Sequence, residues 1–204
     1  ERDQLGPDLV PDYLTNVPLG AHYGWPWLYW KTYDDVRVNT APPEFIDDYV
    51  RKPEYALGAH TAPLGLAFIR GGELMGPDFT NGAFIARHGS WNRKPAAGYD
   101  VVFIAFDANG NPLGKPLPVL TGFLTGEGTT RGRPTWVGFA KDGNRLVVKV
   151  VLPRGGSLRD GEATLSLSVP KAAKLEISTV SAEVESIRVS GDQRVNSVSG
   201  NVGL

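Results

Sequence analysis

Runs of apolar residues separated by turn sequences predict a chain built largely from short β-strands. Strands of this kind are roughly four to eight residues long, rich in Val, Ile and Phe, and bounded by Gly, Pro, Asn or Asp. The runs that fit this description are residues 64–69, 82–87, 100–106 and 145–152. The pattern predicts one strand for each run.

Turn signals are stronger than helix signals along the chain. Asn109-Gly110, within residues 107–112, is a strong hairpin signal, and residues 141–145 form a second turn candidate. Residues 7–17 could hold a helical turn, but Pro7, Pro11 and the following Pro18 crowd that stretch, and proline disrupts the interior of a helix. With 25 Gly and 16 Pro in the chain, we expect an all-β fold with little helix.

A nine-residue repeat marks the C-terminal part, where Val-Ser pairs begin at Val180, Val189 and Val198. Apolar and polar residues alternate over 174–179. Short strands at a fixed period are typical of stacked β rungs, in which each repeat packs on its neighbours. An ordinary series of hairpins is the alternative that the sequence leaves open.

The aromatic residues divide the chain into two parts. All 5 Trp, 7 Tyr and 8 Phe lie before residue 140, whereas the remainder is rich in Val, Ser, Leu and Lys. We therefore expect two segments with different cores, meeting near residues 141–155, with Gly155-Gly156 as a linker point. The second segment would bury only a thin core.

Overall composition excludes several classes of protein. The 204 residues are 41% hydrophobic and 21% charged, with a formal net charge of −1, so no bulk field favours nucleic acid. No apolar run is long enough for a membrane-spanning helix, and the absence of cysteine excludes disulfides and thiolate metal sites. A chain that begins at Glu1 without a signal peptide is expected to be a fragment or a processed product.

Residues 86–100 carry the densest group of polar side chains and raise the question of a pocket rim. One of the three histidines, His88, lies there, and His22 and His60 lie in similar contexts rich in Gly or Pro. Such a histidine can serve as a catalytic base. It can equally well hydrogen-bond a turn and do nothing more, and no spacing among the three indicates a metal site.

Other residues suggest ligands, each with a simpler alternative. Arg131 and Arg133 point the same way if they lie in a strand, so both could grip one anionic ligand, or they could protect a solvated edge strand. Asp8, Asp12 and the acids of residues 1–3 could offer oxygen ligands to calcium. The aromatic cluster at residues 23–30 could stack on a sugar or planar cofactor, or form core.

Five longer motifs occur in order over about residues 1–147. They read ERDQLGPDLVPDYLTNV…GAHYGWPW, PEYALGAHTAPLGLAF, FTNGAFIARHGSWNRKPAAGYDVVFIAF, PVLTGFLTGEG and GRPTWVGFAKDGNRLVV. Together they resemble the C-terminal part of the glucose/sorbosone dehydrogenase family. Members of that family are sugar dehydrogenases that depend on pyrroloquinoline quinone (PQQ) and are built on a six-bladed β-propeller. Since a blade takes roughly 40–50 residues, the resemblance implies a partial propeller of about three blades.

The resemblance also implies a cofactor site. PQQ is a planar tricarboxylate, and calcium polarises its quinone in proteins of this type. By resemblance, Arg93, Arg131 and Arg133 would contact PQQ, and Trp91 and Asn92 would line the mouth of the same site. The half of the family that carries the expected catalytic base lies outside this resemblance. No motif assigns the role of base to His22, His60 or His88.

The remainder, residues 148–204, resembles the repetitive segments of the DUF4097 putative-adhesin family in its Val-Ser-Gly-Asp/Asn rungs. We expect a partial propeller over 1–147 and a small β-repeat segment over 148–204. Residues 145–153 should form one strand across this boundary, and 155–161 the turn that follows. An exposed strand edge and a tendency to self-associate are further expectations.

The function implied by the resemblance is PQQ-dependent oxidation of a sugar or sugar aldehyde. It would use an electron acceptor such as a cytochrome or a quinone, in the periplasm or outside the cell, and would be incomplete in this chain. Two alternatives are a non-enzymatic carbohydrate- or surface-binding β protein and a non-functional chimera of the two families.

Overall fold

The computed structural model confirms the all-β prediction. It describes residues 3–71, 76–124, 132–139, 146–151, 166–167, 169, 171, 174–181, 184–199 and 201–203. Within these residues the helical elements are the four-residue helix α1 (Ile46–Tyr49) and two 3₁₀ turns, η1 (Asp3–Leu5) and η2 (Pro77–Phe79); loops and turns connect the strands elsewhere. No helix in the described part has the length and apolar character needed to cross a membrane.

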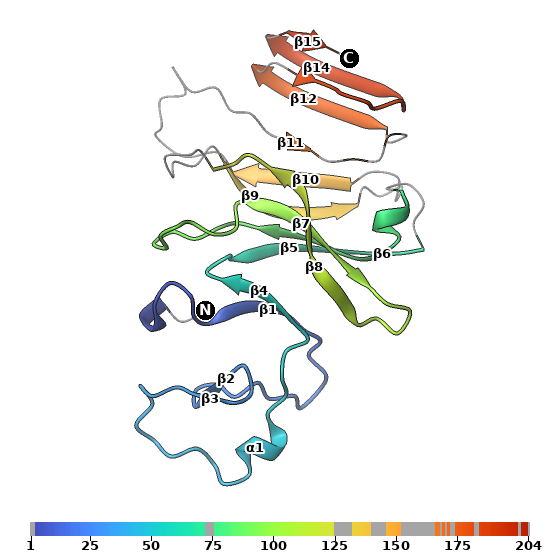
Figure 1. The fold of residues 1–204 in the computed structure, drawn as a ribbon. Helices are drawn as coiled ribbons and strands as arrows, with labels where there is room; N and C mark the ends of the chain where they lie inside the picture. The colour runs from blue at the N-terminus through green and yellow to red at the C-terminus, as the bar shows by residue number, and fades with distance from the viewer. Residues whose placement is uncertain are drawn as a thin grey trace. The chain divides into compact units, whose positions relative to one another are not determined.

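The chain forms two compact units, which we describe separately (Figure 1). Unit 1 comprises Glu1–Pro63 and Gly89–Gly98, and unit 2 comprises Leu64–His88 and Tyr99–Leu204. The loop at residues 89–98 thus belongs to a different unit from the strands on either side of it. The predicted boundary near residue 147 falls within unit 2, and it stays a prediction about the origin of the two segments.

Unit 1 is built from two strand pairs around small cores. β1 (Pro11–Leu14) pairs antiparallel with β4 (Tyr55–Ala59), with a register shift between Asp12 and Tyr13. β2 (Leu28–Tyr29) pairs with β3 (Tyr33–Asp34). Trp27 packs against the buried cluster of Leu28, Ile46 and Val50. The aromatic cluster at residues 23–30 is therefore partly core, as one of its two interpretations predicts.

Unit 2 contains a complete four-stranded blade. Its strands are β5 (Pro63–Arg70), β6 (Asn81–Arg87), β7 (Asp100–Phe106) and β8 (Pro112–Thr121), paired in sequence order. The three strands predicted in this region are confirmed. The hairpin at Asn109-Gly110 is also confirmed: Gly110 has φ 87° and donates its N–H to the carbonyl of Asp107 at 3.1 Å.

The core of unit 2 lies between this blade and β9 (Arg133–Phe139). β9 pairs antiparallel with β10 (Leu146–Val151), which confirms the strand predicted over 145–152. Close packing is possible because Gly65 has no side chain: a Cβ there would lie 2.6 Å from the backbone nitrogen of Val137. The buried residues of this core are Ala67, Phe84, Ala86, Val101, Phe103, Val119 and Val137.

The tail adds to the blade and then stacks on itself. β11 (Ser166–Leu167) pairs antiparallel with Leu120 and Thr121 at the end of β8. β8 also contains three prolines, Pro112, Pro116 and Pro118, and proline has no N–H to donate to a further strand. In the described residues, the tail therefore pairs with the part of β8 that follows the last proline.

The C-terminal strands pair in parallel. β12 (Leu175–Ser181) pairs with β14 (Gln193–Ser199), and β13 (Val184–Glu185) pairs with β15 (Val202–Gly203) (Figure 1). Leu175 lies opposite Gln193 and Val184 opposite Val202, so each strand pairs with the one two nine-residue periods further along. This pairing confirms stacked rungs over hairpins. The turns expected at residues 141–145 and 155–161, with Gly155-Gly156, lie outside the described residues.

Candidate functional site

The loop at residues 89–98 is a fixed element of unit 1. Ser90, with 3% of its surface exposed, donates its N–H to the carbonyl of Ala97 at 2.9 Å, and its hydroxyl accepts the N–H of Ala97 at 3.1 Å. The N–H of Gly89 reaches the carbonyl of Thr61 at 2.8 Å. A Cβ at Gly98 would lie 2.9 Å from that same carbonyl oxygen. The loop is therefore held at both ends against residue 61.

A pocket of about 320 Å³ lies beside this loop, within unit 1. Asn92 and Arg93, two of the predicted site residues, line it. Trp91 precedes them in the loop but is 74% exposed and is not among the lining residues. The full lining is Gly6, Pro7, His60, Asn92, Arg93 and Lys94.

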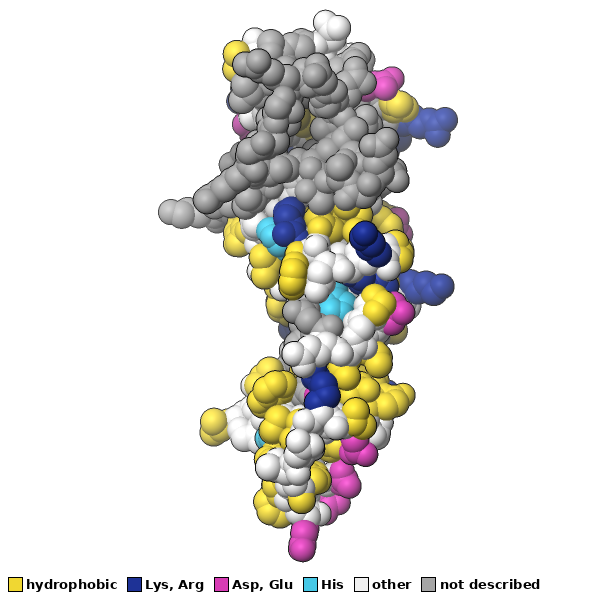
Figure 2. All heavy atoms as spheres, turned by 90° about the vertical axis from the view of Figure 1, so that its left-hand side faces the viewer, with side chains coloured by type: hydrophobic (Ala, Val, Ile, Leu, Met, Phe, Trp, Pro, Cys, Tyr) yellow, Lys and Arg dark blue, Asp and Glu magenta, His cyan; other side chains and the backbone are white. Residues whose placement is uncertain are grey.

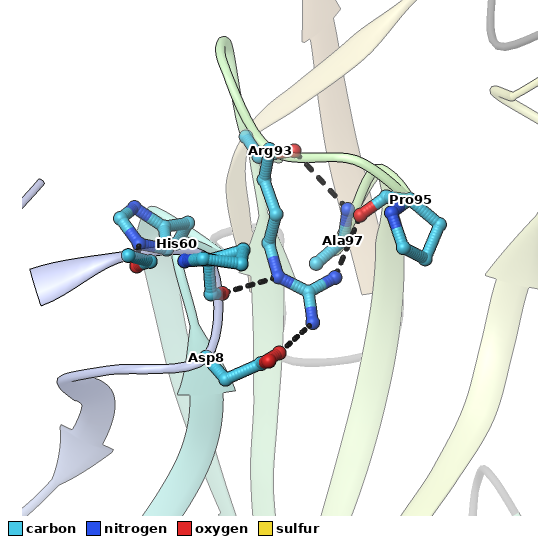
Figure 3. Close-up of polar contacts among 8 residues, drawn as sticks. Asp8, His60, Arg93, Pro95 and Ala97 are labelled. Carbon is cyan, nitrogen blue, oxygen red and sulfur yellow. Dashed lines mark hydrogen bonds and ion pairs between the residues drawn. The ribbon is translucent and has the colours of Figure 1, made fainter.

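The guanidinium of Arg93 is anchored on three sides (Figure 3). Its Nε donates to the carbonyl of Pro7 at 2.6 Å and one terminal nitrogen donates to the carbonyl of Pro95 at 2.7 Å. The other terminal nitrogen pairs with the carboxylate of Asp8 at 2.9 Å. Because the Asp8 side chain is 81% exposed, solvent screens this pair and it contributes little to stability. Its main effect is to fix the direction of the arginine side chain.

Lys94 is the second cation that lines the pocket and, unlike Arg93, has no partner among the described residues that would keep it from binding a ligand. Its side chain is exposed, and it makes no hydrogen bond or ion pair with the residues that the structure describes. Lys94 was not a predicted site residue, although it directly follows Arg93 in the sequence. An ammonium group beside an amide and an anchored guanidinium suits a carboxylate ligand.

His60 is another lining residue that, like Gly6, Pro7 and Lys94, is not among the predicted site residues. It is 2% exposed, and its Nε2 donates to the carbonyl of Gly6 at 2.9 Å. His22, by contrast, accepts the N–H of Gly24 on its Nδ1 at 3.0 Å. His22 therefore stabilises a turn, which is one of the two roles that the sequence leaves open for the histidines. His60 is part of the pocket wall.

The predicted calcium ligands do not gather around one point in the described residues. Asp8 pairs with Arg93, and a carboxylate oxygen of Asp12 accepts from Thr61 and Ala62. Within that part of the chain, no three His, Asp or Glu side chains form a group that could hold a metal ion. Calcium binding stays a prediction of the family resemblance.

A second polar cluster lies in unit 2, around Arg133. Its Nε donates to the carbonyl of His88 at 3.2 Å, and its guanidinium lies 5.1 Å from the ring centre of Tyr99. The Nδ1 of His88 lies 3.1 Å from the carbonyl of Pro134, so Nδ1 carries the proton. Burial, and secondarily the charge of Arg133, lower the pKa of His88 from its ordinary value of 6.5. Arg131, the other predicted arginine of this strand, lies outside the described residues.

Comparison with known proteins places this chain beside PQQ-dependent sugar dehydrogenases. Residues 38–119 match a family described as TrAA12-like. Two relatives are an uncharacterized protein of Borreliella burgdorferi, 32% identical over 149 residues, and a PQQ-dependent pyranose dehydrogenase of Coprinopsis cinerea, 34% identical over 113 residues. The alignments cover 71% and 48% of this chain. They cover only 38% and 15% of the two relatives.

The fold has a solved counterpart. The calcium structure of the Trichoderma reesei carbohydrate-active enzyme of family AA12 superimposes with a TM-score of 0.54 at 21% identity, covering 72% of this chain and 42% of that one. This similarity shows the fold alone, a partial β-propeller. The sequence matches support the coarser part of the predicted resemblance, a relation to PQQ-dependent sugar dehydrogenases. The DUF4097 resemblance of residues 148–204 stays a prediction.

Proposed function

We propose that this chain is part of a PQQ-dependent sugar oxidoreductase and that the pocket of unit 1 receives the carboxylate edge of PQQ. One observation carries the proposal: the pocket gathers Asn92, Arg93 and Lys94 on one fixed loop. These are an amide, an anchored guanidinium and an available ammonium. Charge-assisted hydrogen bonds from such donors are the strongest that a carboxylate accepts.

The donor set and the space fit this group. Ligand pockets typically measure about 300–1,000 Å³, and this one is about 320 Å³. Gly6 and Pro7 offer an apolar wall beside the polar loop. When bound, PQQ would supply the acceptor for the hydride, and with it the two electrons, that leaves the sugar carbon. The chain's own residues would hold the cofactor: Lys94 balances its negative charge, and Arg93 and Asn92 fix its orientation.

The finer parts of the function are proposals from the same resemblance. Arg131, Arg133 and Trp91 would contact PQQ as well, with calcium at the quinone. The substrate would be a sugar or sugar aldehyde, the electron acceptor a cytochrome or quinone, and the location periplasmic or extracellular. The resemblance assigns the role of catalytic base to no residue of this chain, so we expect PQQ binding without turnover on aldoses.

Titration with PQQ, followed by tryptophan fluorescence, tests the proposal. The wild-type chain should show saturable quenching, and Lys94→Ala should weaken the affinity about tenfold or more, because one charge-assisted bond is worth roughly 1.5–3 kcal/mol. Lys115→Ala is the matched control, since Lys115 is an exposed lysine on β8 of unit 2. Unchanged affinity in Lys94→Ala would refute the pocket assignment.

A carbohydrate-binding protein without PQQ is the second candidate, favoured by the exposed aromatic side chains of unit 1. Trp25 is 68% exposed, and the rings of Tyr29 and Tyr33 stack at 5.4 Å. Figure 2 shows hydrophobic side chains at the surface in its lower part, at the level where Figure 1 has β2, β3 and α1. Fluorescence changes with sugar alone, lost in Trp25→Ala, would favour this candidate.

A further inference from the structure

The turn at residues 60–62 is held in a backbone conformation that its residues rarely adopt. His60 has φ 59° and Ala62 has φ 48°, in the left-handed region that costs free energy for residues with a Cβ. Two positions earlier the chain has Gly58 at φ 95°, where glycine adopts the same sign of φ without strain. Glycine at position 60 would remove the strain but also the imidazole.

The carboxylate of Asp12 offsets this strain. A single oxygen of Asp12 accepts the N–H of Thr61 at 2.7 Å, the N–H of Ala62 at 2.9 Å and the hydroxyl of Thr61 at 3.0 Å. Asp12 lies on β1 at its register shift, and irregularities of this kind direct a side chain away from the ordinary alternation of a strand. The three donors belong to the left-handed turn itself, so the bonds specify its conformation.

The same turn forms part of the pocket. Its carbonyl at Thr61 accepts the N–H of Gly89 at 2.8 Å, which joins it to the loop that carries Asn92, Arg93 and Lys94. Its imidazole, His60, is 2% exposed, bonds to Gly6 and lines the pocket. Asp12 does not line the pocket, so it can act on a ligand only through the turn.

We infer that Asp12 is a positioning residue of the pocket, which holds the 60–62 turn so that His60 and the 89–98 loop form a preorganised wall for the ligand. The inference rests on the proposed function for the identity of that ligand. Preorganisation raises affinity because the ordering of the wall does not have to occur on binding. Loss of the Asp12 carboxylate should therefore weaken binding without removing any group that touches the ligand.

The test measures the ring of His60 and the affinity for PQQ in the same variants of the full chain. Asp12→Ala should shift the ¹H–¹⁵N signals of the His60 ring and weaken PQQ at least tenfold. Asp12→Asn keeps one carbonyl acceptor, so its His60 signals and its PQQ affinity should lie between those of Asp12→Ala and the wild type. Adding Ala62→Gly to Asp12→Ala should partly restore the His60 signals and the PQQ affinity, because glycine adopts the left-handed conformation without help from the carboxylate. Asp47→Asn, on exposed α1, is the control and should change neither.

Two results would overturn the assignment: His60 signals that stay unchanged in Asp12→Ala, or shifted signals with unaltered PQQ affinity. A different result would refute the proposed function: PQQ would cause no saturable quenching of the tryptophan fluorescence of the wild-type chain. In that case the His60 signals alone decide whether Asp12 positions the turn. If Asp12→Ala does not fold, the same readings are taken on Asp12→Asn against Asp47→Asn.

Discussion

The blade β5–β8 and the rungs β12–β15 are both β structure of unit 2, yet they exclude water to different degrees. Phe84 and Phe103 of the blade are 0% exposed, with ring centres 4.8 Å apart. Among the described side chains of the rungs only Val184 is buried, whereas Val198 is 81% exposed. The blade is therefore stabilised mainly by apolar burial, and the rungs depend more on repeated backbone and side-chain pairing.

The rungs show what replaces a core. Ser178 lies opposite Asn196 in the parallel register, and the amide of Asn196 donates to the hydroxyl of Ser178 at 3.5 Å. Each net hydrogen bond in a folded protein contributes only about 0.5–1.5 kcal/mol. A stack built in this way gains stability from the number of its rungs, while a blade gains it from a few large side chains.

The largest effect should come from the blade core. Phe84→Ala is expected to destabilise unit 2 by about 3–5 kcal/mol, because it removes a buried ring and leaves a cavity between β6 and its neighbours. Urea denaturation followed by circular dichroism measures this change. A loss below about 1 kcal/mol would mean that the blade does not depend on its aromatic core.

A smaller effect is expected in the rungs. Val184→Ala removes two methyl groups from a side chain that is 8% exposed, which should cost about 1.5 kcal/mol. The loss should appear as faster amide hydrogen exchange in β13 and β15 with little change in β6 and β7. Val198→Thr, at an 81% exposed position, is the control and should leave exchange unchanged. Equal acceleration in the blade would show that the two parts unfold together.

The smallest effect is expected from pH, through His88, which directly follows β6. The fold lowers the pKa of His88 through burial and the charge of Arg133, so the neutral ring is favoured in the folded state. Stability from His88 is complete above its unfolded pKa near 6.5 and is lost as the pH falls below that value. Urea denaturation should show a smaller free energy of unfolding at about pH 5.5 than at about pH 7.5. This difference should be smaller in His88→Gln than in the wild type. If His88→Gln shows the same difference between the two pH values as the wild type, the pH dependence does not come from His88.

The sequence predicts the parts of the fold that rest on local patterns. The apolar runs at 82–87 and 100–106 are strands whose central residues are buried without a break, whereas the run at 64–69 alternates buried and exposed residues. The nine-residue period of Val180 and Val189 predicts stacking because a parallel rung must bring equivalent residues into register. Neither conclusion requires knowledge of residues distant in the chain.

The site is predictable only in part, because its contacts are long-range. Asn92 and Arg93 follow from the family motif, and both line the pocket. His60 and Asp12 could not be found this way: the bond from Thr61 to Asp12 spans 49 residues, and a left-handed turn without glycine leaves no signal in the sequence. Asp8 was considered as a calcium ligand, but its partner is Arg93, 85 residues away.

The three prolines of β8 set the place where the tail can join the blade. Pro112, Pro116 and Pro118 have no N–H to offer a neighbouring strand, and the described residues of β11 pair with Leu120 and Thr121, beyond the last of them. A strand from the tail that slid along β8 would lose hydrogen bonds at each proline. The prolines therefore favour a single register of β11 on β8. Replacing Pro118 with a residue that donates an N–H should allow β11 to pair with β8 in other registers.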